Sequence, residues 1–490
     1  FLISYKSLGQ YLHDYWYKHE VYTYVLLDSP ERKEEIEKAF PAMSEKYKTD
    51  EALKNKIWGV SLSPLSDIHL KPQVGYEAEI KGNRTAMIAL IFAAIAILAI
   101  AWINYINLTV ARSMERAKEV GVRRVIGAFR KQLVSQFLFE ALVMNLVALV
   151  LAVGLIELIL PYFNQLVSRT VTFSVWLTGY WWLLLLIVFV GGIFLSGYYP
   201  ALALLNRKPI TLLKGKFLNS KSGEGTRKVL VVVQYTASMI LLCGTLIVFA
   251  QLNFMRNQSL GVKTDQTLVV KFPGRTEGMN TKLEAMKKAI ARLPLVDKVT
   301  FSGAVPGEEV ATFLSNRRKS DALKQNRLYE MLVCDPDYID AYGLQLVAGR
   351  GFSEDYGDDV NKLVVNESAV RNLGIASNEE ALGEEIEVEC TDAPMQIIGV
   401  VKDYHQQALN KNYTPIMLIH KDKIGWLPQR YISIVMKSGD PKELVSQVEE
   451  IWHRYFEDSS YDFFFLDQFF DHQYRQDEVF GVMIGCFTGL

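Results

Sequence analysis

Residues 111–131 read ARSMERAKEVGVRRVIGAFRK, and they lie between two long apolar runs. The stretch holds seven Lys and Arg residues against two Glu residues, a net charge of +5. A basic loop beside a membrane span stays on the cytoplasmic side, because Lys and Arg resist translocation. Val122, Val125, Ile126 and Phe129 recur at i, i+3, i+4 and i+7, so a short helix after a break at Gly121 gathers one apolar stripe. The pattern predicts a helix that docks into a groove on another protein; the alternative is a solvated loop that only fixes topology.

The apolar runs on either side predict membrane spans. Residues 84–110 carry no charge from position 86 onward, and at about 1.5 Å per residue this length crosses a hydrocarbon core of about 30 Å. Further spans are predicted at 133–160, at 176–205 after a short periplasmic loop (161–175), and at 229–252. Trp176, Tyr180, Trp181 and Trp182 form an aromatic belt at the start of the third.

Charge fixes the orientation of these spans. The linker 206–228 has seven Lys and Arg residues against one Glu, a net charge of +6, and it lies two spans after 111–132, so both fall on the cytoplasmic side. Residues 253–475 hold 26 basic and 34 acidic residues, a net charge of −8, and their mixed periodicity predicts an α+β domain outside the membrane. Its predicted strands are 267–272, 296–302, 362–365, 395–401 and 431–436, and its predicted helices are 282–293, 367–373 and 442–455.

An internal repeat organises the chain. Residues 21–40, VYTYVLLDSPERKEEIEKAF, repeat the order of residues 431–452, YISIVMKSGDPKELVSQVEEIW: a strand, a helix start with Pro, then an amphipathic helix. A second strand (57–63 in the first copy) and a span follow in each case. We therefore expect 1–83 to be the C-terminal part of a first outside domain. We expect 476–490 to begin a truncated span, in a fragment of a two-half protein of about eight spans.

Motifs for enzymatic chemistry are lacking. The sequence holds no GxxxxGK[ST], GxGxxG, HExxH or GxSxG. Asp403 and His405 imitate a base with its orienting partner, but a satisfied turn is the favoured interpretation. The four cysteines have no metal-ligand spacing; Cys334 and Cys390 form either a disulfide or two buried free thiols, and the second is favoured. Because the basic loops adjoin spans and the large domain is acidic, nucleic acid is excluded as a partner.

Two runs carry a family likeness. Residues 102–142, WINYINLTVARSMERAKEVGVRRVIGAFRKQLVSQFLFEAL, and residues 196–216, SGYYPALALLNRKPITLLKGK, resemble the signature of FtsX/MacB-type ABC transporter permeases. The outside domain is similar to the family's periplasmic core domain through LNFMRNQSLGVKTDQTLVV (252–270), YGLQLVAGRGFSED (342–355), VVNESAVRNLG (364–374) and IIGVVKDYH (397–405). The eight-span, two-half form of Bacteroidetes-type bacteria resembles this chain most.

The resemblance implies a fold and a mechanism. The expected fold is an α-helical transmembrane bundle with α+β, MacB-like periplasmic core domains, in a multi-pass protein of the bacterial inner membrane. An ABC-type ATPase subunit, as a dimer, would dock on the cytoplasmic coupling segment and bind ATP and Mg; this chain itself would bind no cofactor or metal. Residues matching the family's coupling segment, with Val125 added from the stripe, are Arg116, Lys118, Glu119, Gly121, Val122, Arg123, Arg124, Val125, Gly127 and Ala128. ATP hydrolysis would then produce periplasmic movement, which is mechanotransmission.

The resemblance leaves the substrate open: a drug, a peptide, a lipoprotein, or activation of a cell-wall hydrolase. Membrane lipid is an expected partner, and a periplasmic adaptor or hydrolase is a further one. A membrane receptor with a ligand-binding periplasmic domain is the alternative function, but cytoplasmic pieces of about twenty residues lack a signalling output domain. A secondary transporter would require inverted repeats and broken helices, whereas these repeats are parallel.

Overall fold

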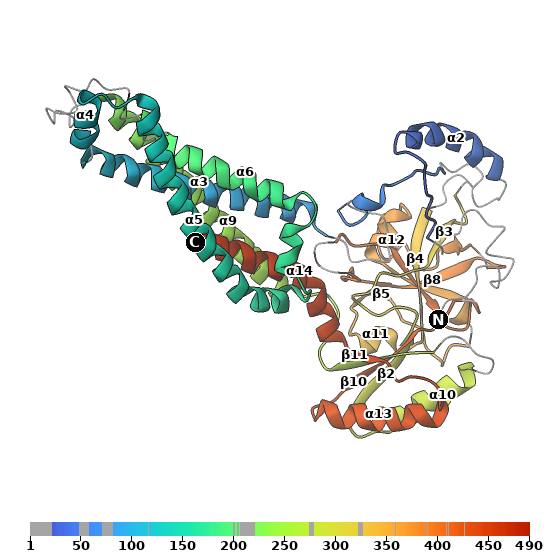
Figure 1. Cartoon of the computed structure of the whole chain (residues 1–490). Helices are drawn as coiled ribbons and strands as arrows, with labels where there is room; N and C mark the ends of the chain where they lie inside the picture. Colours follow the sequence, from blue (N-terminus) through green and yellow to red (C-terminus); the bar gives the residue numbers. More distant parts are fainter. Residues whose placement is uncertain are drawn as a thin grey trace. The chain divides into compact units, whose positions relative to one another are not determined.

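The computed structural model describes residues 22–48, 58–70, 82–115, 117–198, 201–202, 205, 221–273, 279–321, 327–357, 359–389, 391–407, 409, 411–425 and 427–490. The chain divides into two compact units. The first, which we call the domain unit, comprises Phe1–Arg84 and Gly261–Leu466. The second, the membrane unit, comprises Thr85–Leu260 and Asp467–Leu490. Many elements of both are labelled in Figure 1.

One half of the large domain is an α/β sandwich of sheet and helices. Its elements are β1 (Thr267–Lys271), α10 (Met279–Ile290), β2 (Val296–Ser302), β10 (Tyr431–Met436), α13 (Pro441–Tyr455) and β11 (Phe463–Phe465). The strand order β11-β1-β10-β2 is antiparallel throughout, which is a ferredoxin-like arrangement. Apolar side chains of α10 and α13 form one core with those of β1, β2 and β10, including the fully buried Trp452.

A closed ring of strands is inserted between β2 and β10. It consists of β3 (Phe313–Arg318), β4 (Arg327–Cys334), β6 (Lys362–Asn366), β7 (Glu385–Glu387), β8 (Met395–Val401) and β9 (Ile416–His420). Strand β4 pairs with β3, β3 with β7, β7 with β8, β8 with β6, β6 with β9, and β9 with β4, so the ring closes. Because the ring closes, each of these six strands pairs with a neighbour on both sides and none is an edge strand.

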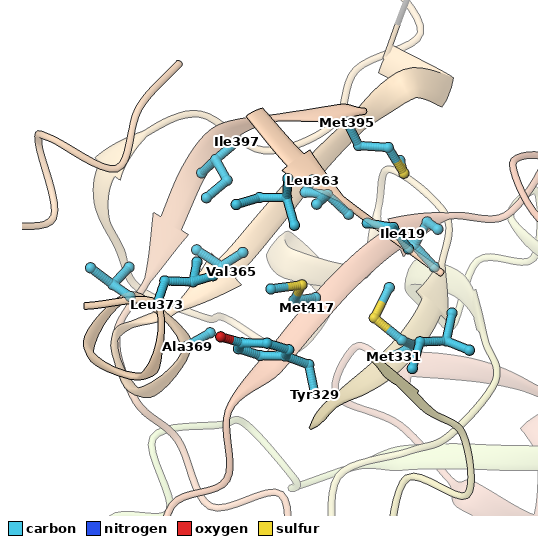
Figure 2. Close-up of a cluster of buried hydrophobic side chains, with 14 of the residues drawn as sticks. Tyr329, Met331, Leu363, Val365, Ala369, Leu373, Met395, Ile397, Met417 and Ile419 are labelled. Atoms are coloured by element: carbon cyan, nitrogen blue, oxygen red, sulfur yellow. The ribbon is translucent and has the colours of Figure 1, made fainter. Parts of the chain in front are cut away.

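The interior of this ring is filled by side chains. Figure 2 shows Tyr329 and Met331 of β4 facing Met417, Ile419, Leu363 and Val365 from the neighbouring strands. Leu363, Val365 and Met417 are 0% exposed. The ring is therefore a packed core, as in other small barrels, and holds no channel. Three shorter elements accompany it: α11 (Tyr338–Ala341), β5 (Leu346–Gly349), which pairs with β8, and α12 (Glu367–Asn372).

The predicted strands and helices of this domain are confirmed within one to three residues at most ends. Strands β3, β4, β5, β7 and β9 were not predicted. In the first repeat copy, α2 (Arg32–Tyr47) confirms the predicted helix. The two strands predicted beside it, at 21–27 and 57–63, are wrong over the residues that the structure describes, 22–27 and 58–63, which form no strand.

Four helices of the membrane unit are long and apolar enough to cross a bilayer: Arg84–Thr109, Arg130–Val167, Trp181–Tyr198 and Lys228–Asn257. They belong to α3 (Arg84–Glu115), α5 (Arg130–Val167), α6 (Trp181–Ile193) with the π-helical turn η4 (Phe194–Tyr198), and α9 (Lys221–Asn257). At about 1.5 Å per residue, the 38 residues of α5 extend for about 57 Å, well beyond a hydrocarbon core.

Several predicted boundaries differ from the structure. Helix α5 continues through Pro161 to Val167, because a proline in a membrane helix removes one hydrogen bond without forcing the helix to end. Helix α9 begins at Lys221, within the stretch predicted as a flexible linker. Helix α14 (Leu466–Gly489) begins ten residues before the predicted span, and residues 467–490 belong to the membrane unit.

Helices α9 and α14 lie against each other in antiparallel fashion. An added Cβ at Gly481 would lie 2.6 Å from Leu252, and one at Gly485 would lie 3.4 Å from Phe249. The hydroxyl oxygens of Thr245 and Thr488 are hydrogen-bonded at 2.6 Å. Small residues at four-residue spacing thus allow close helix approach in a membrane.

Candidate functional site

The predicted coupling residues gather around α4 (Ala117–Val125), between α3 and α5. Helix α4 contains Lys118, Glu119, Gly121, Val122, Arg123, Arg124 and Val125, whereas Gly127 and Ala128 lie in the turn that follows it; Arg116 and the Lys118 side chain fall outside the described part of the structure. The predicted break at Gly121 is wrong. Gly121 is buried, and α4 runs through it without interruption.

The inner face of α4 is anchored by apolar contacts. Val120 (6% exposed) joins one cluster with Leu133 of α5, Ala201 and Leu205, each at most 3% exposed. Ala128 packs partly against the same cluster. These residues come from three separate stretches of the chain, so the cluster fixes α4 to the start of α5 and to the end of the third span.

Arg124 adds a polar contact to this anchor. Its Nη1 donates to the backbone carbonyl of Leu205 at 3.1 Å, across 81 residues of sequence. Arg124 is half-buried, and its guanidinium is therefore directed toward the membrane unit itself.

Arg123 lies within a chain of hydrogen bonds. Its Nη2 donates to Glu119 Oε1 at 2.6 Å and its Nη1 donates to Gln136 Oε1 at 2.6 Å. Gln136 Nε2 in turn donates to Glu140 Oε1 at 3.3 Å, one helical turn further along α5. The chain links α4 to the first three turns of α5.

A tight turn joins α4 to α5. Helix α4 ends at Val125, so the predicted apolar stripe is not one helical face: Ile126 and Phe129 lie in the connection. Gly127 has φ +104°, a backbone conformation that favours glycine, and the Ala128 N–H donates to the Arg123 carbonyl at 2.9 Å. The Phe129 N–H donates to Gln132 Oε1 at 3.0 Å, which satisfies an N–H at the start of α5.

Four apolar side chains of this segment are nevertheless exposed, and we call them together the apolar patch. The exposed fractions are 45% for Val122, 64% for Val125, 80% for Ile126 and 74% for Phe129. They alternate with the anchored residues, so α4 presents one side to the bundle and another outward.

Behind this segment, the third span packs closely on α5. Asn145 Nδ2 donates to the Ala141 carbonyl at 2.7 Å and to Ser196 Oγ at 3.2 Å. An added Cβ at Gly197 would lie 3.0 Å from Ala141 Cβ and 3.1 Å from the Phe137 carbonyl oxygen. Close approach was predicted for Gly191, Gly192 and Gly197. It is confirmed for Gly192 and Gly197, while around Gly191 the described atoms leave open space.

Sequence reasoning missed Gln136, Asn145, Ser196 and Leu205 as members of this arrangement. A signal exists for the first of these, because Gln132, Gln136 and Glu140 recur every four residues at the cytoplasmic start of an apolar helix. The Leu205 carbonyl, as a backbone group, leaves no trace in the sequence.

The Asp403 and His405 pair is structural, as favoured from the sequence. Asp403 accepts hydrogen bonds from the Ser368 N–H at 2.8 Å, the Ser368 hydroxyl at 2.9 Å and Arg371 at 2.5 Å, and so caps α12. The His405 ring lies 4.4 Å from the Tyr413 ring, and burial lowers the pKa of its imidazole.

Neither metal nor disulfide chemistry emerges from the described residues. Within them, no group of three or more His, Cys, Asp or Glu side chains could hold a metal ion. Cys334 is a buried free thiol whose pKa is raised by burial, as favoured, and Cys390 lies outside the described residues.

Two family models match the chain. The model for the FtsX-like permease C-terminal region matches residues 91–209, and the model for the MacB-like periplasmic core domain matches residues 236–451. The macrolide export ATP-binding/permease protein MacB of Campylobacter jejuni is 32% identical over 133 residues. This match covers 27% of the chain and 20% of that relative, so the chain spans about a fifth of its length.

Solved structures resemble the domain unit at low identity. The periplasmic region of MacB from Actinobacillus actinomycetemcomitans is 16% identical, with a TM-score of 0.31, over 44% of this chain and 94% of that one. The extracellular domain of the noncanonic ABC-type transporter YknZ from Gram-positive bacteria is 15% identical, with a TM-score of 0.30, over 40% of this chain and 97% of that one.

Proposed function

The chain belongs to the FtsX/MacB-type family of ABC transporter permeases, and we propose that it couples ATP hydrolysis by a separate ATPase subunit to movement of its periplasmic domains. It is a multi-pass membrane protein with a periplasmic α/β domain. We place it in the bacterial inner membrane. ATP and Mg would be held by the ATPase, and the chain would contribute no catalytic group.

The observation that carries this proposal is the combination of the two family matches with exposed apolar side chains on α4 and in the turn after it. The positive charge of this segment predicts that it is cytoplasmic. Apolar side chains exposed beside polar ones mark protein interaction sites. Val125, Ile126 and Phe129, each more than 60% exposed, would fill a groove on the ATPase. We therefore name α4 the coupling helix.

The apolar character of the spans supports mechanotransmission. Within each of the four candidate spans, an 18-residue window holds at most two Asp, Glu, Lys or Arg residues. A conduit for a polar substrate would need ionisable or polar groups along it. To act on a substrate already in the periplasm or in a membrane leaflet, the permease needs only rigid helices that transmit movement across the membrane. Helices α5 and α9 are long enough to project from the membrane.

The MacB relative is described by its name as a macrolide exporter. Export or extraction of an apolar small molecule is one use of such movement, and activation of a periplasmic adaptor or hydrolase is another. Both would rest on the same coupling helix.

The test is co-purification of the permease with a co-expressed ABC-type ATPase subunit from the same organism. The paired change Val125→Ser and Ile126→Ser should lower ATPase association at least about tenfold, because two apolar anchors of the interface are lost. Tyr162→Ser is the matched control, since Tyr162 is 73% exposed at the far end of α5. Association that survives the paired change, or falls equally in the control, would contradict this proposal.

A further inference from the structure

We propose that Arg123 and Arg124 do not contact the ATPase but brace the coupling helix against the transmembrane bundle, so that force on α4 reaches α5 and the third span. This inference rests on the proposed function. It assigns the two arginines as positioning residues, in contrast to the apolar patch, which would contact the partner.

The Arg124 contact fixes the coupling helix to the third span. Its Nη1 donates to the Leu205 carbonyl, and the Leu205 side chain is 2% exposed within the cluster that also buries Val120. A guanidinium that donates to a backbone carbonyl holds position through a charge-assisted hydrogen bond. The donor is engaged inward and so is poorly placed to contact a docked protein through the same nitrogen.

Arg123 fixes the coupling helix to α5. Two nitrogens of one guanidinium bridge Glu119 on α4 and Gln136 on α5, both at 2.6 Å, and Gln136 continues to Glu140. The planar guanidinium directs its N–H groups in fixed directions, which a lysine ammonium does not do. The pair with Glu119 is exposed and adds little stability by itself, so the bridge acts by fixing direction.

Both braces end on helices that are packed together. Gly197 in η4 lies against Phe137 and Ala141 of α5, and Asn145 of α5 donates to Ser196 of η4. Packed interiors transmit displacement because they contain few voids to absorb it. The coupling helix, the first turns of α5, η4 and Leu205 therefore move together when α4 is pushed.

The residues of the coupling segment divide accordingly. Val120, Arg123 and Arg124 attach α4 to the bundle, whereas Val125 and Ile126 face outward. The positive charge predicted from the sequence as a docking feature is thus engaged largely by the permease itself at these two positions.

The experiment measures two quantities on the intact complex in nanodiscs: the Kd of the ATPase for the permease, and the stimulation of ATPase turnover when the permease is saturating. Arg123→Gln and Arg124→Met should leave the Kd within about threefold and lower the stimulation at least about fivefold, since binding and coupling are separable free energies. Lys131→Gln, an exposed change of the same charge on α5, should alter neither quantity.

Rescue separates bracing from a merely structural role. Arg124→Lys keeps one donor for the Leu205 carbonyl and should retain most of the stimulation. In the pair Arg123→Gln with Gln136→Arg, the guanidinium moves to α5 beside Glu140, and this pair should restore stimulation that Arg123→Gln loses. A fold defect would not respond to such an exchange.

Two results would overturn the inference: a Kd weakened more than about tenfold by either single change, which would make the arginines contact residues, or unchanged stimulation in both. If the unmodified permease binds no ATPase, the proposed function itself is wrong. The amide hydrogen-exchange rate of residues 119–125 then tests, without an ATPase, whether the two arginines attach α4 to the bundle. This rate should rise in Arg123→Gln and Arg124→Met, and an unchanged rate would refute the attachment.

Discussion

The two copies of the internal repeat, residues 22–47 and 431–455, have similar patterns and different structures. In the second copy, β10 is a central strand followed by α13. In the first copy, α2 forms as well, but residues 22–27 form no strand. The same kind of sequence thus gives a helix in both places and a strand in only one.

Hydrogen bonding explains the difference. A helix satisfies its N–H and C=O groups within itself, whereas a strand needs neighbours on its edges. Strand β10 pairs with β1 on one side and β2 on the other, and Ile432 and Ile434 are 0% exposed. In the first copy, Tyr24 is 71% and Leu26 is 99% exposed, with no paired strand beside them among the described residues. The sequence pattern predicts that a segment can form a strand, and the presence of neighbouring strands decides whether the strand forms.

Proline substitution should break this contrast most strongly. Ile434→Pro in β10 removes a ladder N–H and a fully buried side chain, so we expect the free energy of unfolding of the α/β half to fall by about 5 kcal/mol or more. Tyr24→Pro, the matched change in the first copy, should be nearly neutral. Denaturant unfolding of the purified full chain, with amide exchange of β1 and β2, measures both. Equal losses would show that residues 22–27 are also paired.

A rise in pH should destabilise the closed ring of strands and leave the stability of the first repeat copy unchanged. Glu330 on β4 is 2% exposed, and burial raises its pKa from 4.5 to about 7, against the opposing hydrogen bond from Thr414. Because the folded pKa lies above the unfolded one, its contribution is complete below about pH 4.5 and is lost as pH rises through 7. The difference corresponds to about 3 kcal/mol.

Glu330→Gln should remove this part of the pH dependence. The measurement is the stability of the full chain at pH 5 and pH 8, followed by exchange of β4 amides corrected for their intrinsic rates. In the unmodified chain, β4 should lose protection at pH 8 while α2 does not. A pH dependence identical in the Gln variant would show that Glu330 titrates near its ordinary value.

The smallest expected difference concerns the helix starts. The Asp440 side chain caps α13 by accepting from the Lys442 N–H at 2.9 Å, while over the described residues α2 begins without a side-chain cap. Asp440→Ala should cost about 1 kcal/mol, and Ser29→Ala at the start of α2 should cost less than about 0.5 kcal/mol. Differential scanning calorimetry of the two variants and of the unmodified chain measures both losses of stability. A larger loss for Ser29→Ala would mean that it holds an unrecognised cap.

Strands β4 and β9 were missed, although the predicted strands β6 and β10 are buried almost as completely, so burial on both faces does not by itself decide which strands a sequence predicts. β9 (Ile416–His420) is buried at every position and β4 is buried at its last six, so neither shows the alternation that identifies a strand. The closing of the ring by β4 and β9, which are parallel and far apart in sequence, follows from no local pattern.

The site divides in the same way. Net charge and apolar pattern predicted a cytoplasmic coupling segment, and the structure shows that Val125, Ile126 and Phe129 within it are exposed. The inward engagement of Arg123 and Arg124 was not predictable, because their partners are Gln136 and a carbonyl 81 residues away. The predicted break at Gly121 is wrong because α4 continues through this buried glycine, so the low helix propensity of one residue did not decide the local structure.

By itself, the sequence predicted the four candidate spans and the helices that the structure has, since hydropathy and intrahelical hydrogen bonds act within one segment. The orientation of the spans, which rests on charge, stays a prediction. Tertiary structure alone decided which extended segments became strands, that six of them close into a ring, and which side of α4 faces the bundle. These outcomes depend on hydrogen bonds and packing contacts between segments distant in the chain, and only the folded molecule brings both partners together.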